Sequence, residues 1–141
     1  MGIADLGIFV GTWNTTGEML ATASQPATRL VATDTYRWLA GEKFMLHDVD
    51  ARLGNDVSRL LEIIGWDEGQ RRFTARSYDD QGGIEDFTAT LSERRWQIFG
   101  ETTRFDGMFS ADGKRLAGRW ERREPGAEWA AWMTIELRRA Y

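Results

Sequence analysis

The fold class is indicated by the stretch RRFTARSY, residues 71–78, and by the turns on either side of it. The turn sequences are DEGQ at 67–70 and DDQGG at 79–83. Between them, apolar or small side chains alternate with polar ones, as Phe73, Ala75 and Ser77 against Arg72, Thr74 and Arg76. Alternation of period two between turn residues predicts a half-buried β-strand flanked by hairpins.

The same pattern of short alternating segments and turns recurs along the whole chain, which predicts an all-β fold. We expect a short helical turn over residues 1–8 and a linker over 20–27 with room for one helical turn. The expected strands are 9–19, 28–39, 42–53, 57–66, 71–78, 84–91, 95–104, 105–110, 114–123 and 128–139. Ten strands in an up-and-down meander favour one closed antiparallel barrel over residues 1–141, because closure removes the strand edges. A two-sheet sandwich is the alternative.

Composition excludes several classes of protein. The chain has no cysteine, which excludes disulfides and thiolate chemistry, and its single histidine excludes any site that needs two. A net charge of −4 argues against a nucleic-acid binder. No run of about 20 apolar residues predicts a membrane span. No basic leader precedes the first strand, so we expect a cytoplasmic protein. No cofactor and no metal site are expected.

Four short motifs resemble a known family. Gly11-Thr12-Trp13 resembles the G-x-W element that opens lipocalins and other calycins, and IGWD (64–67), YDDQGG (78–83) and GAEW (126–129) together resemble the bacterial DUF1579 family. The resemblance implies a lipocalin-like ten-stranded barrel with an internal cavity. It also implies that Trp13 caps one end and stacks on an arginine of the last strand, for which Arg139 has the right parity. Nitrobindin-like haem barrels are similar in size, but they bind iron through a histidine near the C-terminus, and no histidine follows His47.

His47 is the sharpest candidate for chemistry. Its parity places it with Met45 and Val49 on the inner face, where an imidazole could act as acid or base near neutral pH. Asp34 shares the inward parity of its strand and could pair with His47 or lie in water at the strand end. Glu62 stands in the apolar run 60–64, and parity does not decide which face carries it. The alternative is a structural histidine bonded to a neighbouring hydroxyl or carboxylate.

Three functions follow from these residues. The first is binding of a small apolar or aromatic molecule in the barrel, with the wall formed by Tyr36, Trp38, Met45, His47, Ser77, Trp120, Trp129 and Met133. The second is an isomerase or cyclase in which His47 works with Asp34 or Glu62 as acid–base pair. The third is a homodimer that forms through Trp132, whose parity with Thr134, Glu136 and Arg138 predicts an exposed ring.

Overall fold

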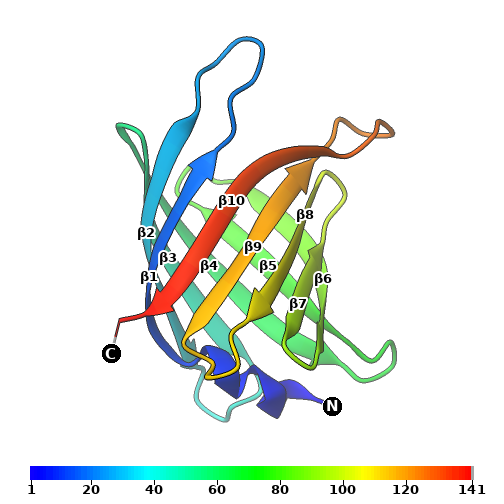
Figure 1. The fold of residues 1–141 in the computed structure, drawn as a ribbon. Coiled ribbons are helices and arrows are strands. Elements are labelled where there is room, and N and C mark those ends of the chain that lie inside the picture. The colour runs from blue at the N-terminus through cyan, green and yellow to red at the C-terminus, as the bar shows by residue number, and fades with distance from the viewer. Residues whose placement is uncertain (141) are drawn as a thin grey trace.

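The computed structural model describes residues 1–140 and shows a closed antiparallel barrel (Figure 1). The strands run in chain order around the barrel, and β1 closes it by pairing with both β2 and β10. The predicted all-β antiparallel barrel is therefore confirmed, and the sandwich is excluded. The elements are a 3-10 helix η1 (Ile3–Phe9), β1 (Gly11–Met19), β2 (Thr28–Trp38), β3 (Met45–Leu53), β4 (Asp56–Asp67), β5 (Arg72–Asp79), β6 (Ile84–Ser92), β7 (Arg95–Phe99), β8 (Thr103–Phe109), β9 (Arg115–Arg122) and β10 (Ala130–Arg139).

Several element boundaries differ from the sequence prediction. The expected strand 42–53 begins at Met45, and the strands expected at 105–110 and 128–139 are Thr103–Phe109 and Ala130–Arg139. Phe9 belongs to η1 rather than to the first strand. The segment 20–27 contains a hydrogen-bonded turn, from Thr22 N to Gln25 O at 2.9 Å, and no helical turn. The expected strand 95–104 ends at Phe99, because the amide of Gly100 donates to the carbonyl of Thr103 and turns the chain there.

One end of the barrel is closed by η1, which lies across it in Figure 1. Two of its apolar side chains, Leu6 and Phe9, are fully buried, as is Trp13 at the start of β1. The Phe9 ring stacks on Tyr36 with centroids 4.7 Å apart and meets Trp96 edge-on at 5.0 Å. The indole N–H of Trp13 donates to the Phe9 carbonyl at 2.8 Å. This packing of aromatic side chains makes the closed end the hydrophobic core.

Arg139 fastens the last strand to the closed end. Its guanidinium carbon lies 4.3 Å from the Trp13 ring, the contact that the resemblance to calycins implied. The same group donates hydrogen bonds to the carbonyls of Ile8, Val10 (2.7 Å) and Gly113 (3.2 Å). A side chain at Gly11 would meet this guanidinium at 2.9 Å, and φ there is 132°, so a larger residue would strain the backbone and displace the guanidinium. We call this set of contacts the Arg139 clasp.

A β-bulge interrupts β10. Ala131 lies opposite Glu121, but Met133 lies opposite Trp120, so Trp132 is an extra residue in the ladder. The bulge reverses the alternation of side chains in the residues that precede it. The prediction that Trp129 faces inward with Met133 is therefore wrong. Its ring instead lies between the guanidinium groups of Arg104 and Arg123, at 4.4 and 4.3 Å.

The bulge also changes the surroundings of Trp132, which the sequence predicted to be exposed. Its ring is half-buried and meets that of Trp120 edge-on, with centroids 6.4 Å apart.

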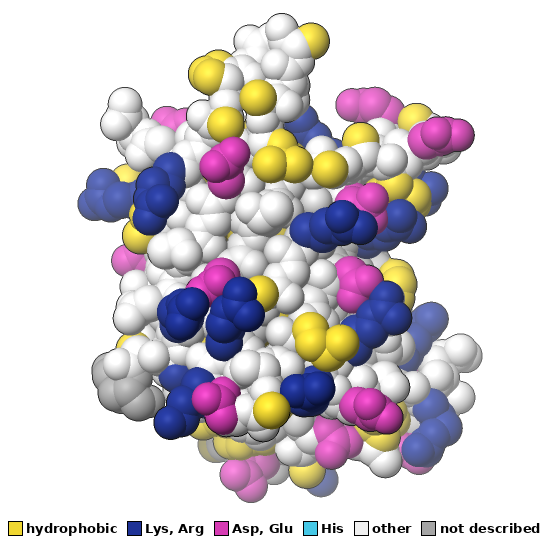
Figure 2. Space-filling model, viewed as in Figure 1, with side chains coloured by type: hydrophobic (Ala, Val, Ile, Leu, Met, Phe, Trp, Pro, Cys, Tyr) yellow, Lys and Arg dark blue, Asp and Glu magenta, His cyan; other side chains and the backbone are white. Residues whose placement is uncertain are grey.

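Figure 2 shows acidic and basic side chains interspersed over the face formed by β1, β10 and β9. In the described part of the chain, no helix is long and apolar enough to span a bilayer.

Candidate functional site

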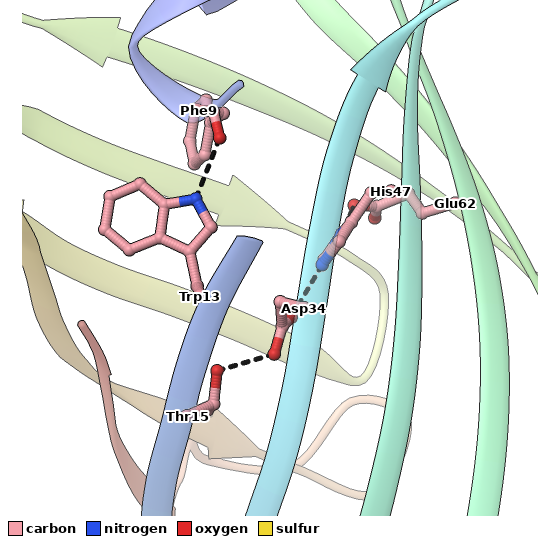
Figure 3. A network of polar contacts seen from close by, with 6 residues as sticks. All are labelled: Phe9, Trp13, Thr15, Asp34, His47 and Glu62. Atoms are coloured by element: carbon pink, nitrogen blue, oxygen red, sulfur yellow. Dashed lines mark hydrogen bonds and ion pairs between the residues drawn. The ribbon is translucent and has the colours of Figure 1, made fainter. Parts of the chain in front are cut away.

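A row of polar side chains crosses the inner face of four neighbouring strands. Tyr36 of β2 lies opposite His47 of β3, His47 opposite Glu62 of β4, and Glu62 opposite Ser77 of β5. Period-two alternation then puts all four on the face that carries the core. Asp34 of β2 and Thr15 of β1 extend the row, as Figure 3 shows. We call these six residues the polar wall.

His47 is held between two carboxylates. Its Nε2 lies 2.7 Å from Asp34 Oδ2, and its Nδ1 lies 2.9 Å from Glu62 Oε1. Because an ionised carboxylate only accepts hydrogen bonds, both ring nitrogens carry protons and the ring is an imidazolium. Burial alone would lower the pKa of His47, but the hydrogen bonds and charges of Asp34 and Glu62 outweigh it and raise the pKa to about 9.

The neighbours of His47 fix its orientation. The Tyr36 ring stacks on the imidazole with centroids 3.9 Å apart and an interplanar angle of 10°. The Thr15 hydroxyl donates a hydrogen bond to Asp34 Oδ1 at 2.6 Å. The other carboxylate oxygen of Asp34 is therefore available to His47. Burial, and then the charges of Asp34 and Glu62, hold the pKa of Tyr36 well above its usual value. Tyr36 is therefore a neutral phenol beside a charged imidazolium.

The structure brings together only some of the residues that the sequence grouped as a binding wall. His47, Tyr36 and Ser77 lie on the polar wall with Asp34 and Glu62. Trp38 packs against the core at the closed end, and Met45 is fully buried there. Trp120 and Met133 lie opposite each other on β9 and β10 and are half-buried. Trp129 is on the outer face, for the reason given above.

Inward-facing side chains are not equally covered along the barrel. Most of those next to η1, such as Met45 and Ile64, are fully buried, whereas the Asp34, His47 and Glu62 side chains are 10%, 12% and 12% exposed. Beyond the polar wall, toward the end away from η1, Ala32, Ala51 and Phe105 are buried, but several other inward apolar side chains are half-buried. These include Val49, Leu60, Phe87, Trp120, Met133 and Ile135. The polar wall thus stands between a packed core and a more open, apolar part of the interior.

A second groove of about 570 Å³ lies along the outer face of β4, β5 and β6, and its lining also includes the inward residue Phe87. Phe44 covers Gly65 there, where a side chain would come within 2.9 Å of the ring. The charged lining includes Arg76 and Asp86, which form an ion pair at 2.7 Å and neutralise each other. The polar wall, with its unbalanced charges, is the stronger candidate site.

Sequence reasoning missed two features near the site. Thr15 has the same parity as Trp13, and this parity could have identified it as an inward hydroxyl. Trp132 Nε1 is buried and has no hydrogen-bond partner within residues 1–140. No bulge could be inferred from β10, so this atom could not be placed. Within the same residues, no cluster of three or more His, Asp and Glu side chains is arranged to hold a metal ion.

Comparisons with known proteins give a family and a fold. The family model described as "Protein of unknown function (DUF1579)" matches residues 4–87. The chain is similar to the crystal structure of Rv2717c from M. tuberculosis, with a TM-score of 0.70 and 13% identity over 99% of this chain and 97% of that one. It is also similar to the S-type phycobiliprotein lyase CPES from Guillardia theta, with a TM-score of 0.50 and 9% identity over 100% and 94%. No curated protein matches the chain. At these identities the likeness to the two structures shows the fold alone.

Proposed function

The chain belongs to DUF1579, a family of proteins of unknown function, and we propose that its barrel binds a small organic molecule against the polar wall. The observation that carries this proposal is the His47 imidazolium, fixed between Asp34 and Glu62 on the inner face. Charged groups are costly to bury, and replacement by apolar residues is often neutral or stabilising. A charged cluster at the border of an apolar interior is typical of the few polar groups that orient a ligand.

Two further observations support the barrel interior as the binding region. All six residues of the polar wall lie within the stretch that the family model matches, residues 4–87. Several inward apolar side chains beyond the wall are half-buried, and they include the aromatic rings of Phe87 and Trp120. Such surfaces suit an apolar or aromatic molecule. The ligand would then place a polar group at the wall and its apolar body toward the end of the barrel away from η1, which we call the open end.

The acid–base alternative has less support. Both ring nitrogens of His47 are occupied by carboxylates of the protein, so neither is free to exchange a proton with a bound molecule. His47 is therefore better suited to position Asp34 and Glu62 than to react. Homodimerisation stays a prediction, and its predicted contact, the Trp132 ring, is half-buried against Trp120.

Binding can be tested with the neutral aromatic probe N-phenyl-1-naphthylamine. We expect saturable fluorescence enhancement, with NMR shifts of the backbone amides of residues 34, 47, 62 and 77. Met133→Trp should weaken binding because it fills the interior, whereas Thr134→Trp adds the same ring to the outer face and should not. Absence of saturable binding, or shifts confined to the outer groove around Phe44, Tyr78 and Phe99, would overturn the proposal.

A further inference from the structure

The charges of the polar wall do not balance. Asp34 and Glu62 contribute two negative charges and the His47 imidazolium contributes one positive charge, which leaves one negative charge on the polar wall. Glu85 of β6, which lies opposite Ser77, adds a further carboxylate next to this row. Within residues 1–140, the ion pairs of Asp34 and Glu62 are with His47 alone. Arg139 of β10, which has the inward parity, is held in the clasp at the closed end, and Arg122 on the inward parity of β9 lies over the Trp132 ring, 5.4 Å from its centroid. An uncompensated charge inside a barrel is costly unless something pairs with it.

The wall also has polar atoms that the protein does not use. Glu62 bonds to His47 through Oε1, and no hydrogen bond within residues 1–140 engages its Oε2. The hydroxyls of Tyr36 and Ser77 also make no hydrogen bond within these residues, although both residues are only 6% exposed. Across those residues, Trp132 Nε1 is the one polar side-chain atom that is both buried and unpartnered. The free atoms of Glu62, Tyr36 and Ser77 therefore keep contact with open space.

These free atoms are mainly acceptors of hydrogen bonds. Glu62 Oε2 is an anionic acceptor, and the two hydroxyl oxygens accept as well as donate. Asp34 and Glu62 together would repel a carboxylate or a phosphate from this position. A group that both donates hydrogen bonds and carries positive charge satisfies the free acceptors and cancels the excess charge at once.

We propose that the ligand of this barrel is an organic cation, an ammonium or protonated nitrogen base that donates to Glu62 Oε2 beside Tyr36 and Ser77. Its apolar or aromatic body lies along the half-buried side chains toward the open end, such as Leu60 and Phe87. This inference rests on the proposed function and adds the chemical class of the ligand.

A set of three probes with one aromatic body tests the sign of the charge. 1-Naphthylmethylamine is a cation at neutral pH, 1-naphthalenemethanol is neutral, and 1-naphthoate is an anion. By isothermal titration calorimetry with the wild-type chain, we expect the amine to bind roughly tenfold to a hundredfold more tightly than the alcohol, because a charged hydrogen bond is added. The anion should bind most weakly of the three.

Variants then identify the group that accepts the cation. Glu62→Gln keeps an acceptor for His47 and removes the negative charge. The affinity of the amine should then fall to about that of the alcohol, because both probes contact a neutral side chain. Glu18→Gln removes the same charge from the outer face of β1 and should leave the preference unchanged. Thermal melts of both variants check folding, and the wild-type series decides the charge preference even where a variant is destabilised.

The outcomes separate this inference from the proposed function. Equal binding of all three probes, or tightest binding of the alcohol or the anion, would overturn the cationic ligand and leave the barrel as a binding site. An amine preference that Glu62→Gln retains would overturn the role of Glu62. Failure of all three probes and of N-phenyl-1-naphthylamine to bind would overturn the proposed function itself.

Discussion

His47 makes the stability of this protein depend on pH in a range where few other groups titrate. The chain has one histidine and no cysteine, and histidine alone among side chains has an ordinary pKa near 7. Its pKa rises from 6.5 in the unfolded chain to about 9 in the barrel. A raised pKa means that the folded state holds the proton more tightly. The stabilisation is therefore complete below pH 6.5 and is lost as pH rises through about 9.

We expect the free energy of unfolding to fall between pH 6.5 and 9 by an amount on the order of 3 kcal/mol, from the change of pKa. Urea unfolding across this range measures the loss. His47→Gln, which cannot titrate, should show a flat profile. Direct titration of the ring nitrogens by NMR offers a second measurement. An imidazole that titrates near 6.5 in the folded chain would contradict the structure around His47.

Arg139 should contribute more to stability than an ordinary surface arginine. Arg139→Ala removes three charged hydrogen bonds and the contact with Trp13, so we expect a loss of about 3 kcal/mol in the free energy of unfolding. The neighbouring Arg138→Ala removes only an exposed ion pair with Glu136 and should cost less than about 1 kcal/mol. Chemical denaturation of both variants compares them, and equal losses would count against the clasp.

The inner wall of β8 and β9 depends on two glycines. The ring of Phe105 lies where side chains at Gly107 and Gly118 would stand, with ring atoms 2.6 Å from both Cβ positions. Gly118→Ala would also bring its methyl group to 2.3 Å from the Asp106 carbonyl oxygen, so the two strands must separate. We expect this overpacking to cost about 1–3 kcal/mol.

Gly7→Ala in η1 is the matched control, because a methyl group there meets nothing within 4 Å. It should change the free energy of unfolding by less than about 0.5 kcal/mol. Thermal melts followed by circular dichroism measure both variants. A Gly118→Ala chain as stable as the control would show that β8 and β9 can accommodate the methyl group.

Strand parity predicts much of the fold and the site, and its failures have structural causes. It places His47 inward and allows a hydrogen bond between His47 and Asp34, and the structure has both features. It cannot orient Glu62, because β4 carries apolar residues on both faces. Leu60 and Ile64 face the interior, while Ile63 lines the outer groove. Parity fails for Trp129, because no glycine or turn residue in the sequence marks the bulge at Trp132.

The barrel as a whole depends on its last strand. β10 pairs with β9 on one side and with β1 on the other, so a chain that lacks it has two open edges. We expect residues 1–127 alone to aggregate in size-exclusion chromatography. A synthetic peptide of residues 128–141 should restore a monomeric barrel when added during refolding, by adding a strand to both edges. A monomeric 1–127 fragment with the circular dichroism spectrum of the whole chain would contradict this.

The pairing of Trp13 with Arg139 also constrains the order of events during synthesis. A ribosome makes the chain from β1 onward, and hairpins of neighbouring strands can form as they emerge. The first strand, however, keeps a bare edge until the last one leaves the exit tunnel. Until then, any hairpins that have formed make an open sheet with β1 at one edge. That bare edge is able to pair with other chains until β10 arrives.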